Sequence, residues 1–266
     1  QQDRPLAGGP LGSWYAPNIT SDEVSGIGGW SDDELVQYLK TGRAPGKNQA
    51  AGGMAEAVEH SLQYLPDSDL HAIATYLKGT APIRDEGDTL PAFSYGAPYD
   101  VENNIRGRNP NNANHSLDNG AALFSGNCAS CHQPDGAGSA NQAYPSLFHN
   151  TATGLSNPNN LISAILFGVQ RDTADHQVLM PGFSSPSYVD KLNDQQVADI
   201  SNFVLAHYGN AAVTVTAGDV AWVRKGGHPP LLARLQPMML PGMIGAIIVL
   251  LVVIVVWRLM RRRRVE

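Results

Sequence analysis

The sequence predicts a mainly α-helical chain in which two helical segments share one pattern and a single transmembrane helix follows at the C-terminus. Three observations support this prediction. Residues 128–132 read Cys-Ala-Ser-Cys-His, residues 17–77 are repeated by residues 145–204, and residues 237–257 contain no charged side chain.

Cys-x-x-Cys-His is the attachment signature of a c-type haem. Cys128 and Cys131 lie on one helical turn and can reach the two vinyl groups of a porphyrin, and His132 then lies under the iron as its proximal ligand. These are the only two cysteines in the sequence. A zinc site would need further ligands at metal spacing, whereas a redox disulfide between the two cysteines remains the alternative. The motif therefore predicts covalent haem c.

Composition agrees with a chain wrapped around a cofactor. The 266 residues include 27 Gly and 18 Pro, and only 16% are charged. Of the 18 basic and 24 acidic groups, five arginines and one glutamate lie in residues 258–266, which leaves 13 basic and 23 acidic groups, a net charge of −10, before them. This acidic balance argues against nucleic acid as a partner. The chain begins at Gln1 without a signal sequence, so we expect a removed signal peptide or a fragment of an exported protein.

Helix signals recur along the chain. Residues 31–42 begin with a Ser31/Glu34 capping box and end at a glycine, and residues 66–79 carry one apolar face. Residues 83–112 are rich in Pro and Asn and predict a linker. Further helices are expected over residues 117–131, which bear the cysteines, over residues 159–168, and over residues 193–208, which begin with a second capping box.

The repeat relates the two segments at an interval of 126 to 128 residues. It places Gly42 opposite Gly168, and Met54 opposite Met180. Four of the six methionines lie in or beside the apolar C-terminal run, so these two remain for the rest of the chain, one in each repeat. We predict that both are axial iron ligands, with His176 as the competitor of Met180 and a core-filling role as the alternative for Met54.

The same repeat predicts the domain organisation. Residues 1–82 are expected to be the C-terminal part of a haem domain whose own Cys-x-x-Cys-His lies upstream of the first residue. Residues 113–216 are expected to form a complete haem domain, so a second haem would contact Met54. Residues 217–236 are then juxtamembrane.

Residues 237–257 are long enough to cross a bilayer as a helix, because about 20 residues span the hydrocarbon core. Trp257 would lie at the interface, and Arg258 and the basic tail of residues 259–266 follow it. We therefore expect a transmembrane helix over residues 237–258. By the positive-inside rule the C-terminus would be cytoplasmic and the haem domains periplasmic, at a bacterial inner membrane. A buried core helix is the weaker alternative, since no other segment could cover it.

Several stretches resemble the multi-haem cytochrome c subunits of membrane-bound periplasmic dehydrogenases that oxidise alcohols, aldehydes, gluconate or sugars. The likeness covers residues from about 10 to 225. The absence of a second Cys-x-x-Cys-His departs from the family pattern. The stretches that carry the resemblance are residues 14–20 (Trp-Tyr-Ala-Pro-Asn-Ile-Thr), 26–31 (Gly-Ile-Gly-Gly-Trp-Ser), 53–56 (Gly-Met-Ala-Glu) and 69–78.

The resemblance implies tandem class I cytochrome c domains. It implies a relay of electrons from a catalytic dehydrogenase subunit, with or without an additional small subunit, to ubiquinone in the inner membrane. In that fold a proline carbonyl commonly accepts a hydrogen bond from the proximal imidazole, and Pro145 matches this place for His132.

Iron with His and Met ligands has no open position, which favours electron transfer over substrate chemistry. We therefore expect no enzyme in isolation but an electron-transfer subunit of an oxidoreductase. Two alternatives stay open: a cytochrome c subunit of a terminal oxidase or another respiratory complex, and a haem-based sensor module. The sequence names no substrate.

Overall fold

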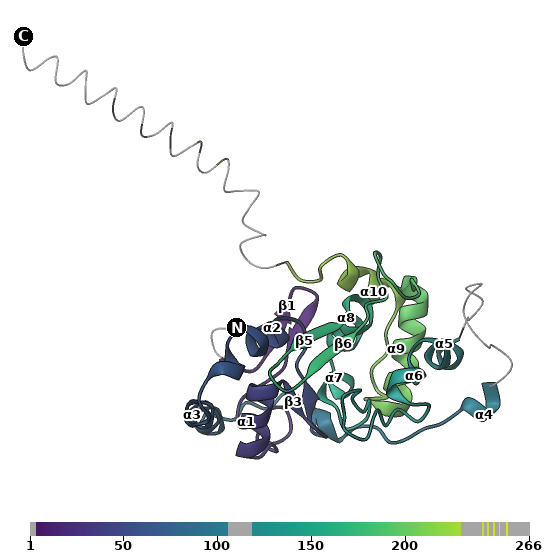
Figure 1. Cartoon of the computed structure of the whole chain (residues 1–266). Coiled ribbons are helices and arrows are strands. Elements are labelled where there is room, and N and C mark those ends of the chain that lie inside the picture. Colours follow the sequence, from purple (N-terminus) through teal and green to yellow (C-terminus); the bar gives the residue numbers. More distant parts are fainter. Residues whose placement is uncertain are drawn as a thin grey trace, which may run out of the picture. The chain divides into compact units, whose positions relative to one another are not determined.

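The structure of the protein is a computed structural model. The described residues are 4–105, 119–229 and the single positions Pro241, Ile244, Ile247, Leu250 and Ile254. The chain divides into a compact unit of residues 1–227 and a second unit of residues 228–266. Within the described part of the first unit, helices predominate and the strands form three two-stranded antiparallel sheets (Figure 1). We call residues 4–82 the N-terminal segment and residues 119–227 the C-terminal segment.

The N-terminal segment contains three helices, two short hairpins and a 3-10 turn. The predicted capping box is present in α1, where Glu34 N donates to Ser31 Oγ and Ser31 N donates to Glu34 Oε2. Gly42 ends this helix in the left-handed conformation, at φ 72°. The elements are β1 (Gly9–Leu11), β2 (Trp14–Ala16), α1 (Asp32–Thr41), β3 (Arg43–Ala44), β4 (Asn48–Gln49), α2 (Gly52–His60), η1 (Leu62–Tyr64) and α3 (Asp67–Lys78).

The connecting stretch and the C-terminal segment contain η2 (Ala92–Ser94), α4 (Glu102–Ile105), α5 (Gly120–Asn127), α6 (Ala129–His132), α7 (Thr151–Gly154), α8 (Asn159–Phe167), β5 (Val169–Asp172), β6 (Gln177–Met180), α9 (Asp194–Tyr208) and α10 (Ala217–Arg224). The capping box predicted for α9 is present. Residues 106–118, which include the end of the expected linker, lie outside the described residues.

Four of the five helices expected between residues 31 and 208 are confirmed as α1, α3, α8 and α9. The fifth, expected over residues 117–131, is two helices, because Cys128 leaves the helical conformation at φ −121° and ends α5. Its expected first residue, Leu117, lies outside the described residues. Residues 52–54, between the first two expected helices, form the first turn of a further helix, α2.

Each segment contains its own apolar core. In the N-terminal segment the core joins α1 and α3 through the buried side chains of Trp30, Leu35 and Ala74. The larger core of the C-terminal segment joins α5, α8, α9 and α10, and Leu123, Ile162 and Val220 are fully buried in it.

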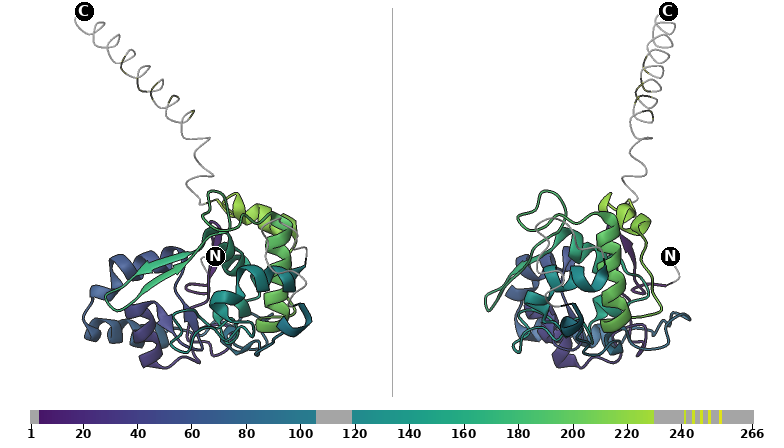
Figure 2. Two further views of the ribbon diagram at one scale, coloured as in Figure 1. Left: turned by 45° about the vertical axis from the view of Figure 1, so that its right-hand side comes forward. Right: turned by 90° about the vertical axis from the view of Figure 1, so that its right-hand side faces the viewer.

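The two segments are joined by hydrogen bonds across their interface. The backbone N–H and carbonyl oxygen of Tyr15 bond the side-chain amide of Asn160, each at 2.9 Å, and Ser163 Oγ donates to Ser13 O at 2.7 Å. The β5–β6 hairpin reaches over the N-terminal segment (Figure 2), where Asp172 N donates to Glu59 Oε2.

These contacts correct the predicted fold class. Tandem class I cytochrome c domains would each form a compact unit, whereas residues 1–227 form only one. The physical reason is the polar interface and the shared hairpin, which close both segments around one interior. The mainly α part of the prediction holds for the described residues.

The predicted transmembrane helix is also corrected. In the part of the chain that the structure describes, no helix is long and apolar enough to cross a bilayer. The longest described helix, α9, has 15 residues and alternates polar with apolar positions, whereas a span needs about 20 apolar residues. Within the described residues, this finding contradicts the predicted anchor over residues 237–258, of which only Pro241, Ile244, Ile247, Leu250 and Ile254 are described, and with it the predicted inner-membrane location with periplasmic haem domains and a cytoplasmic C-terminus. Most of residues 230–266, the basic tail included, lies outside the described residues.

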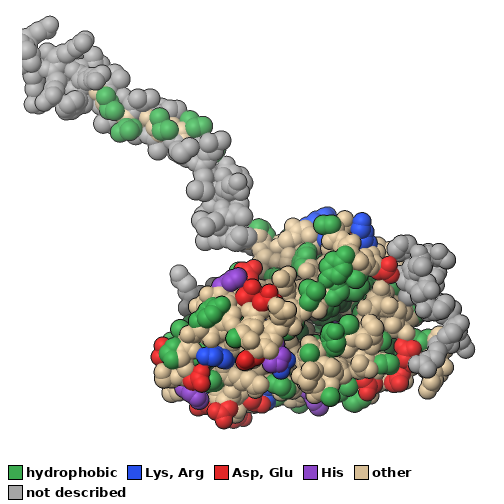
Figure 3. All heavy atoms as spheres, viewed as in Figure 1, with side chains coloured by type: hydrophobic (Ala, Val, Ile, Leu, Met, Phe, Trp, Pro, Cys, Tyr) green, Lys and Arg blue, Asp and Glu red, His purple; other side chains and the backbone are tan. Residues whose placement is uncertain are grey.

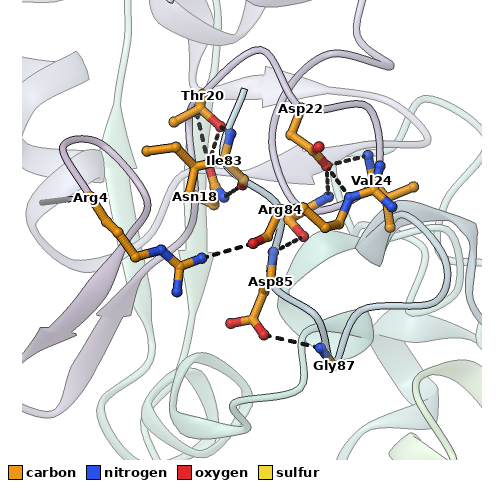
Figure 4. A network of polar contacts seen from close by, with 10 residues as sticks. Arg4, Asn18, Thr20, Asp22, Val24, Ile83, Arg84, Asp85 and Gly87 are labelled. Atoms are coloured by element: carbon orange, nitrogen blue, oxygen red, sulfur yellow. Dashed lines mark hydrogen bonds and ion pairs between the residues drawn. The ribbon is translucent and has the colours of Figure 1, made fainter. Parts of the chain in front are cut away.

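A polar network fastens the connecting stretch to the N-terminal segment (Figure 4). Asp22 is buried, and its Oδ1 accepts from Arg84 Nε at 2.7 Å and from the backbone N–H groups of Val24 and Ser25. Arg4 adds a bond to the Arg84 carbonyl oxygen. Burial alone would raise the pKa of the Asp22 carboxyl, but the hydrogen bonds from Arg84 and the backbone outweigh it and hold that pKa below its usual value.

Asp22→Asn should therefore lower the free energy of unfolding by about 1–2 kcal/mol at pH 7, because it removes the charge from the bond with Arg84. A lowered pKa in the folded state means that the stabilisation is complete above the unfolded pKa of about 3.9 and is lost as the pH falls through the folded value. Urea unfolding between pH 7 and pH 2.5 measures the difference between parent and variant, which should shrink below about pH 4. Asp88→Asn is the control, because it removes the same charge from a residue that lies near Arg84 in the sequence but outside this network. A difference that stays constant over the whole range would contradict the account.

Candidate haem site

A large cavity lies inside the unit of residues 1–227, with a volume of about 700 Å³ and mainly apolar walls. Both segments line it. Leu11 and Leu179 line it as well and are mostly exposed, so its mouth reaches the surface. On the face drawn in Figure 3, hydrophobic side chains gather over the region of α8 and α10, and acidic side chains lie along the edge.

Cys128 is the N-cap residue of α6, Cys131 and His132 lie in its single turn, and all three line the cavity. The turn is held by bonds from Cys131 N and His132 N to the Cys128 carbonyl oxygen, at 3.1 and 3.0 Å. Cys128 and Cys131 form no disulfide with each other in the structure. Burial, with a smaller contribution from Cys131, raises the pKa of the Cys128 thiol to about 12. The two thiols and the imidazole thus face the same apolar space.

His132 is only 8% exposed, and its Nδ1 lies 2.9 Å from the carbonyl oxygen of Pro145. Burial lowers the pKa of the imidazole, although the bond to Pro145 acts in the opposite direction. The ring is therefore neutral at pH 7. Because a carbonyl oxygen only accepts, Nδ1 carries the proton and donates, and Nε2 keeps a lone pair available for a metal.

The loop after α6 brings Pro145 back to His132. Gly138 N donates to His132 O at 2.8 Å, and Leu147 N donates to Gly136 O at 2.9 Å. Gly138 has φ +71°, and a side chain there would overlap the backbone of Tyr144 and Pro145. A glycine is thus required where this loop folds back on itself.

Met180 ends β6 opposite Val169 of β5 and lines the cavity. Met54, in α2 of the other segment, lines the same cavity. His176, the competing ligand, is exposed at the far end of the hairpin and is not among the residues that line it. The structure therefore brings both methionines to the cavity of the motif, and their roles as iron ligands remain predictions.

Gly168 controls the placement of Met180. It ends α8 at φ +75°, and a side chain there would overlap the Met180 carbonyl oxygen. Gly46, in the turn between β3 and β4, has a similar φ of +72°, but a side chain there would meet open space.

Gly168→Ala should thus lower the free energy of unfolding by about 3 kcal/mol or more. The loss has two causes, the strain of a positive φ at an alanine and the displacement of the end of β6 by the new side chain. Gly46→Ala carries the backbone strain alone and should lose only about 1 kcal/mol. Denaturant unfolding of both variants measures the two losses. Equal losses would show that the contact with Met180 does not constrain residue 168.

The site fits a porphyrin. Its volume falls in the range of about 300–1,000 Å³ that is typical of cofactor pockets, and its walls are apolar. A neutral imidazole and a thioether are the donor pair of c-type haem iron. His132 and Met180 would hold the iron, and Cys128 and Cys131 would attach the macrocycle.

Several cavity residues were missed as site residues by sequence reasoning. Trp14 lines the cavity and packs its ring against Gly52, which has φ +52°. Tyr38 lines it too, and burial raises the pKa of its hydroxyl to about 12. Trp14 belongs to a stretch that carries the family resemblance, which was the available signal for it. Tyr38 had none beyond its position on the inner face of α1.

Comparison with known proteins bears on the same site. The cytochrome c family model matches residues 117–207, which contain the motif, Pro145 and Met180. The chain is 49% identical to the fructose dehydrogenase cytochrome subunit of Gluconobacter japonicus over 265 residues, 97% of this chain and 54% of that protein. The chain belongs to the family of dehydrogenase cytochrome c subunits.

Two further relatives support this membership. This cytochrome c subunit is 37% identical to the alcohol dehydrogenase (quinone), cytochrome c subunit, of Gluconacetobacter polyoxogenes, over 84% of its own length and 45% of that protein. It is 36% identical to the gluconate 2-dehydrogenase cytochrome c subunit of Pantoea cypripedii, over 81% of its own length and 46% of that protein. The chain thus spans about half the length of these relatives. The family resemblance inferred from sequence is confirmed, and a cytochrome c domain implies haem c.

Proposed function

We propose that this cytochrome subunit relays electrons from a catalytic dehydrogenase subunit to ubiquinone through haem c bound in the cavity. The observation that carries the proposal is the buried His132, whose Nδ1 bonds the Pro145 carbonyl on a cavity that Cys128, Cys131 and Met180 also line. Haem c, when bound, supplies one-electron oxidation and reduction.

The residues of the chain divide the work of holding such a group. Cys128 and Cys131 would attach it covalently, and His132 would present Nε2 to the iron in an orientation that Pro145 fixes. Met180 would supply a thioether as the second donor, which would leave no position for a substrate. The apolar walls exclude water, so little solvent has to reorganise around the site when its charge changes.

The proposed donor and acceptor rest on the relatives. Their names include fructose, alcohol and gluconate dehydrogenases, and one is named as acting with quinone. We therefore place a catalytic subunit that oxidises a sugar, an alcohol or a sugar acid before this chain, and ubiquinone after it.

Met54 is proposed as the ligand of a second haem. It lines the cavity from the N-terminal segment and stands 126 residues before Met180 in the repeat. A haem-to-protein ratio above one in the purified protein would support the assignment.

Rapid mixing tests the relay. The chain, produced with haem attached and reduced with dithionite in stoichiometric amount, is mixed with a soluble ubiquinone analogue while the haem absorption is followed. Oxidation of the haem within seconds of mixing supports the proposal. A spectrum of reduced haem that persists for minutes in excess quinone contradicts ubiquinone as the acceptor. Cytochrome c in place of the quinone, as a soluble one-electron acceptor, controls for an intact electron-transfer site.

A further inference from the structure

One buried cation has no role in the site described so far. Arg171, on β5, is 1% exposed and is the largest of the fully buried side chains in the described part of the chain. Its Nη1 donates to the Ala50 carbonyl oxygen, and its Nη2 lies 3.4 Å from Gln49 Oε1. Its Nε is buried and has no hydrogen-bond partner among the described residues.

The surroundings of Arg171 hold no balancing negative charge among the described residues. The groups that act on it electrostatically are Tyr38 and Arg43, and Arg43 is itself a cation with a buried, unpartnered Nη1. Burial lowers the pKa of the Arg171 guanidinium, Tyr38 raises it and Arg43 lowers it further. An arginine nevertheless stays protonated at pH 7. A buried positive charge without a counter-ion is costly, so a compensating interaction is to be expected.

The position of Arg171 indicates where that interaction lies. Gln49 and Ala50, which its guanidinium contacts, both line the cavity, and so does Tyr38. The charge therefore stands directly behind the cavity wall. Gly42 makes this position possible, because any side chain there would overlap the guanidinium. Arg171 belongs to the C-terminal segment, whereas Gln49 and Ala50 belong to the N-terminal segment, so the charge reaches this wall across the interface between the two segments.

We propose that Arg171 sets the reduction potential of the haem in this cavity by electrostatic stabilisation of the reduced state. The inference rests on the proposed function, since it requires haem in the cavity. Ferric haem gains one electron on reduction and loses one unit of positive charge, with no proton taken up. A fixed cation behind an apolar wall opposes the ferric state, and the low dielectric of the interior strengthens the effect.

Two kinds of variant separate the charge from its packing. Arg171→Met removes the charge and Arg171→Lys keeps it. Gln49→Glu keeps Arg171 in place and adds a carboxylate beside its Nη2, and Gln49→Leu controls for the bond that Gln49 donates to Gln142 O. Ser163→Ala breaks a bond between the same two segments without any change of charge.

Spectroelectrochemical titration of the haem-loaded chain measures the midpoint potential. Arg171→Met and Gln49→Glu should each lower the equilibrium constant for reduction about tenfold or more, which is about 59 mV for one electron. Arg171→Lys and Ser163→Ala should stay near the parent, and Gln49→Leu, which adds no charge, should lower the equilibrium constant by clearly less than Gln49→Glu does. If Arg171→Met does not fold, Gln49→Glu alone decides.

Two results would overturn the inference. One is an unchanged potential in Gln49→Glu with haem bound, and the other is an equal fall in Arg171→Lys and Arg171→Met, which would make packing rather than charge responsible. The haem content of the parent is measured first. A parent without haem would refute the proposed function itself, and this outcome is distinct from a loaded chain with unchanged potentials.

Discussion

Replacing Cys128 and Cys131 together by alanine should leave the chain with no covalently bound haem. Cys128 caps the N-terminus of α6 and Cys131 lies in it, both line the cavity, and the sequence contains no other cysteine to replace them. Haem staining after denaturing electrophoresis should change from full to none. The variant should also unfold at a lower denaturant concentration than the parent, because the apolar cavity is then left without the macrocycle that would fill it.

Ser130→Ala is the matched control, because Ser130 lies between the cysteines and is exposed. It should keep full staining and parental stability. Covalent haem that survives in the double variant would place the attachment outside this motif.

The second large effect is expected at Met180. Met180→Ala should keep the covalent haem, because Cys128, Cys131 and His132 are untouched, but it should lower the reduction potential and open the iron to added ligands. Carbon monoxide should leave the spectrum of the reduced parent nearly unchanged and convert nearly all of the variant. The physical reason is the loss of the thioether, whose coordination both raises the potential and fills the sixth position.

His176→Ala is the control for this experiment, because His176 is exposed and outside the cavity. It should behave as the parent does. A Met180→Ala variant with parental potential and no carbon monoxide binding would require another ligand. A parent that binds carbon monoxide readily would instead favour the sensor alternative.

The parts of the fold that could be predicted are those that depend on local sequence. The capping boxes of α1 and α9 and the glycines that follow α1 and α8 act within a few residues, so a single sequence reveals them. The attachment motif is equally local, and its spacing alone places three side chains on one turn. The contact between Pro145 and His132 was expected from family resemblance and is present at 2.9 Å.

The parts that could not be predicted depend on contacts between distant residues. The first two residues of α2 are glycines, although glycine has a low helix propensity. Residue 52 is a glycine because the ring of Trp14 packs where a side chain at that position would lie. The hydrogen bonds between Tyr15 and Asn160 join residues 145 positions apart, and no local sequence pattern around either residue predicts them. The shared cavity and the buried Arg171 follow from the same interface, which is why the repeat suggested two domains where one compact unit is found.

We propose above that the cavity of this unit holds haem c through Cys128, Cys131 and His132. The most direct test is mass spectrometry of proteolytic peptides from the chain produced in a host that attaches haem c. We predict that the peptide containing residues 128–132 carries the mass of one haem on two thioether bonds. The same peptide with two free thiols or with a Cys128–Cys131 disulfide, from a host shown to mature another c-type cytochrome, would contradict the claim.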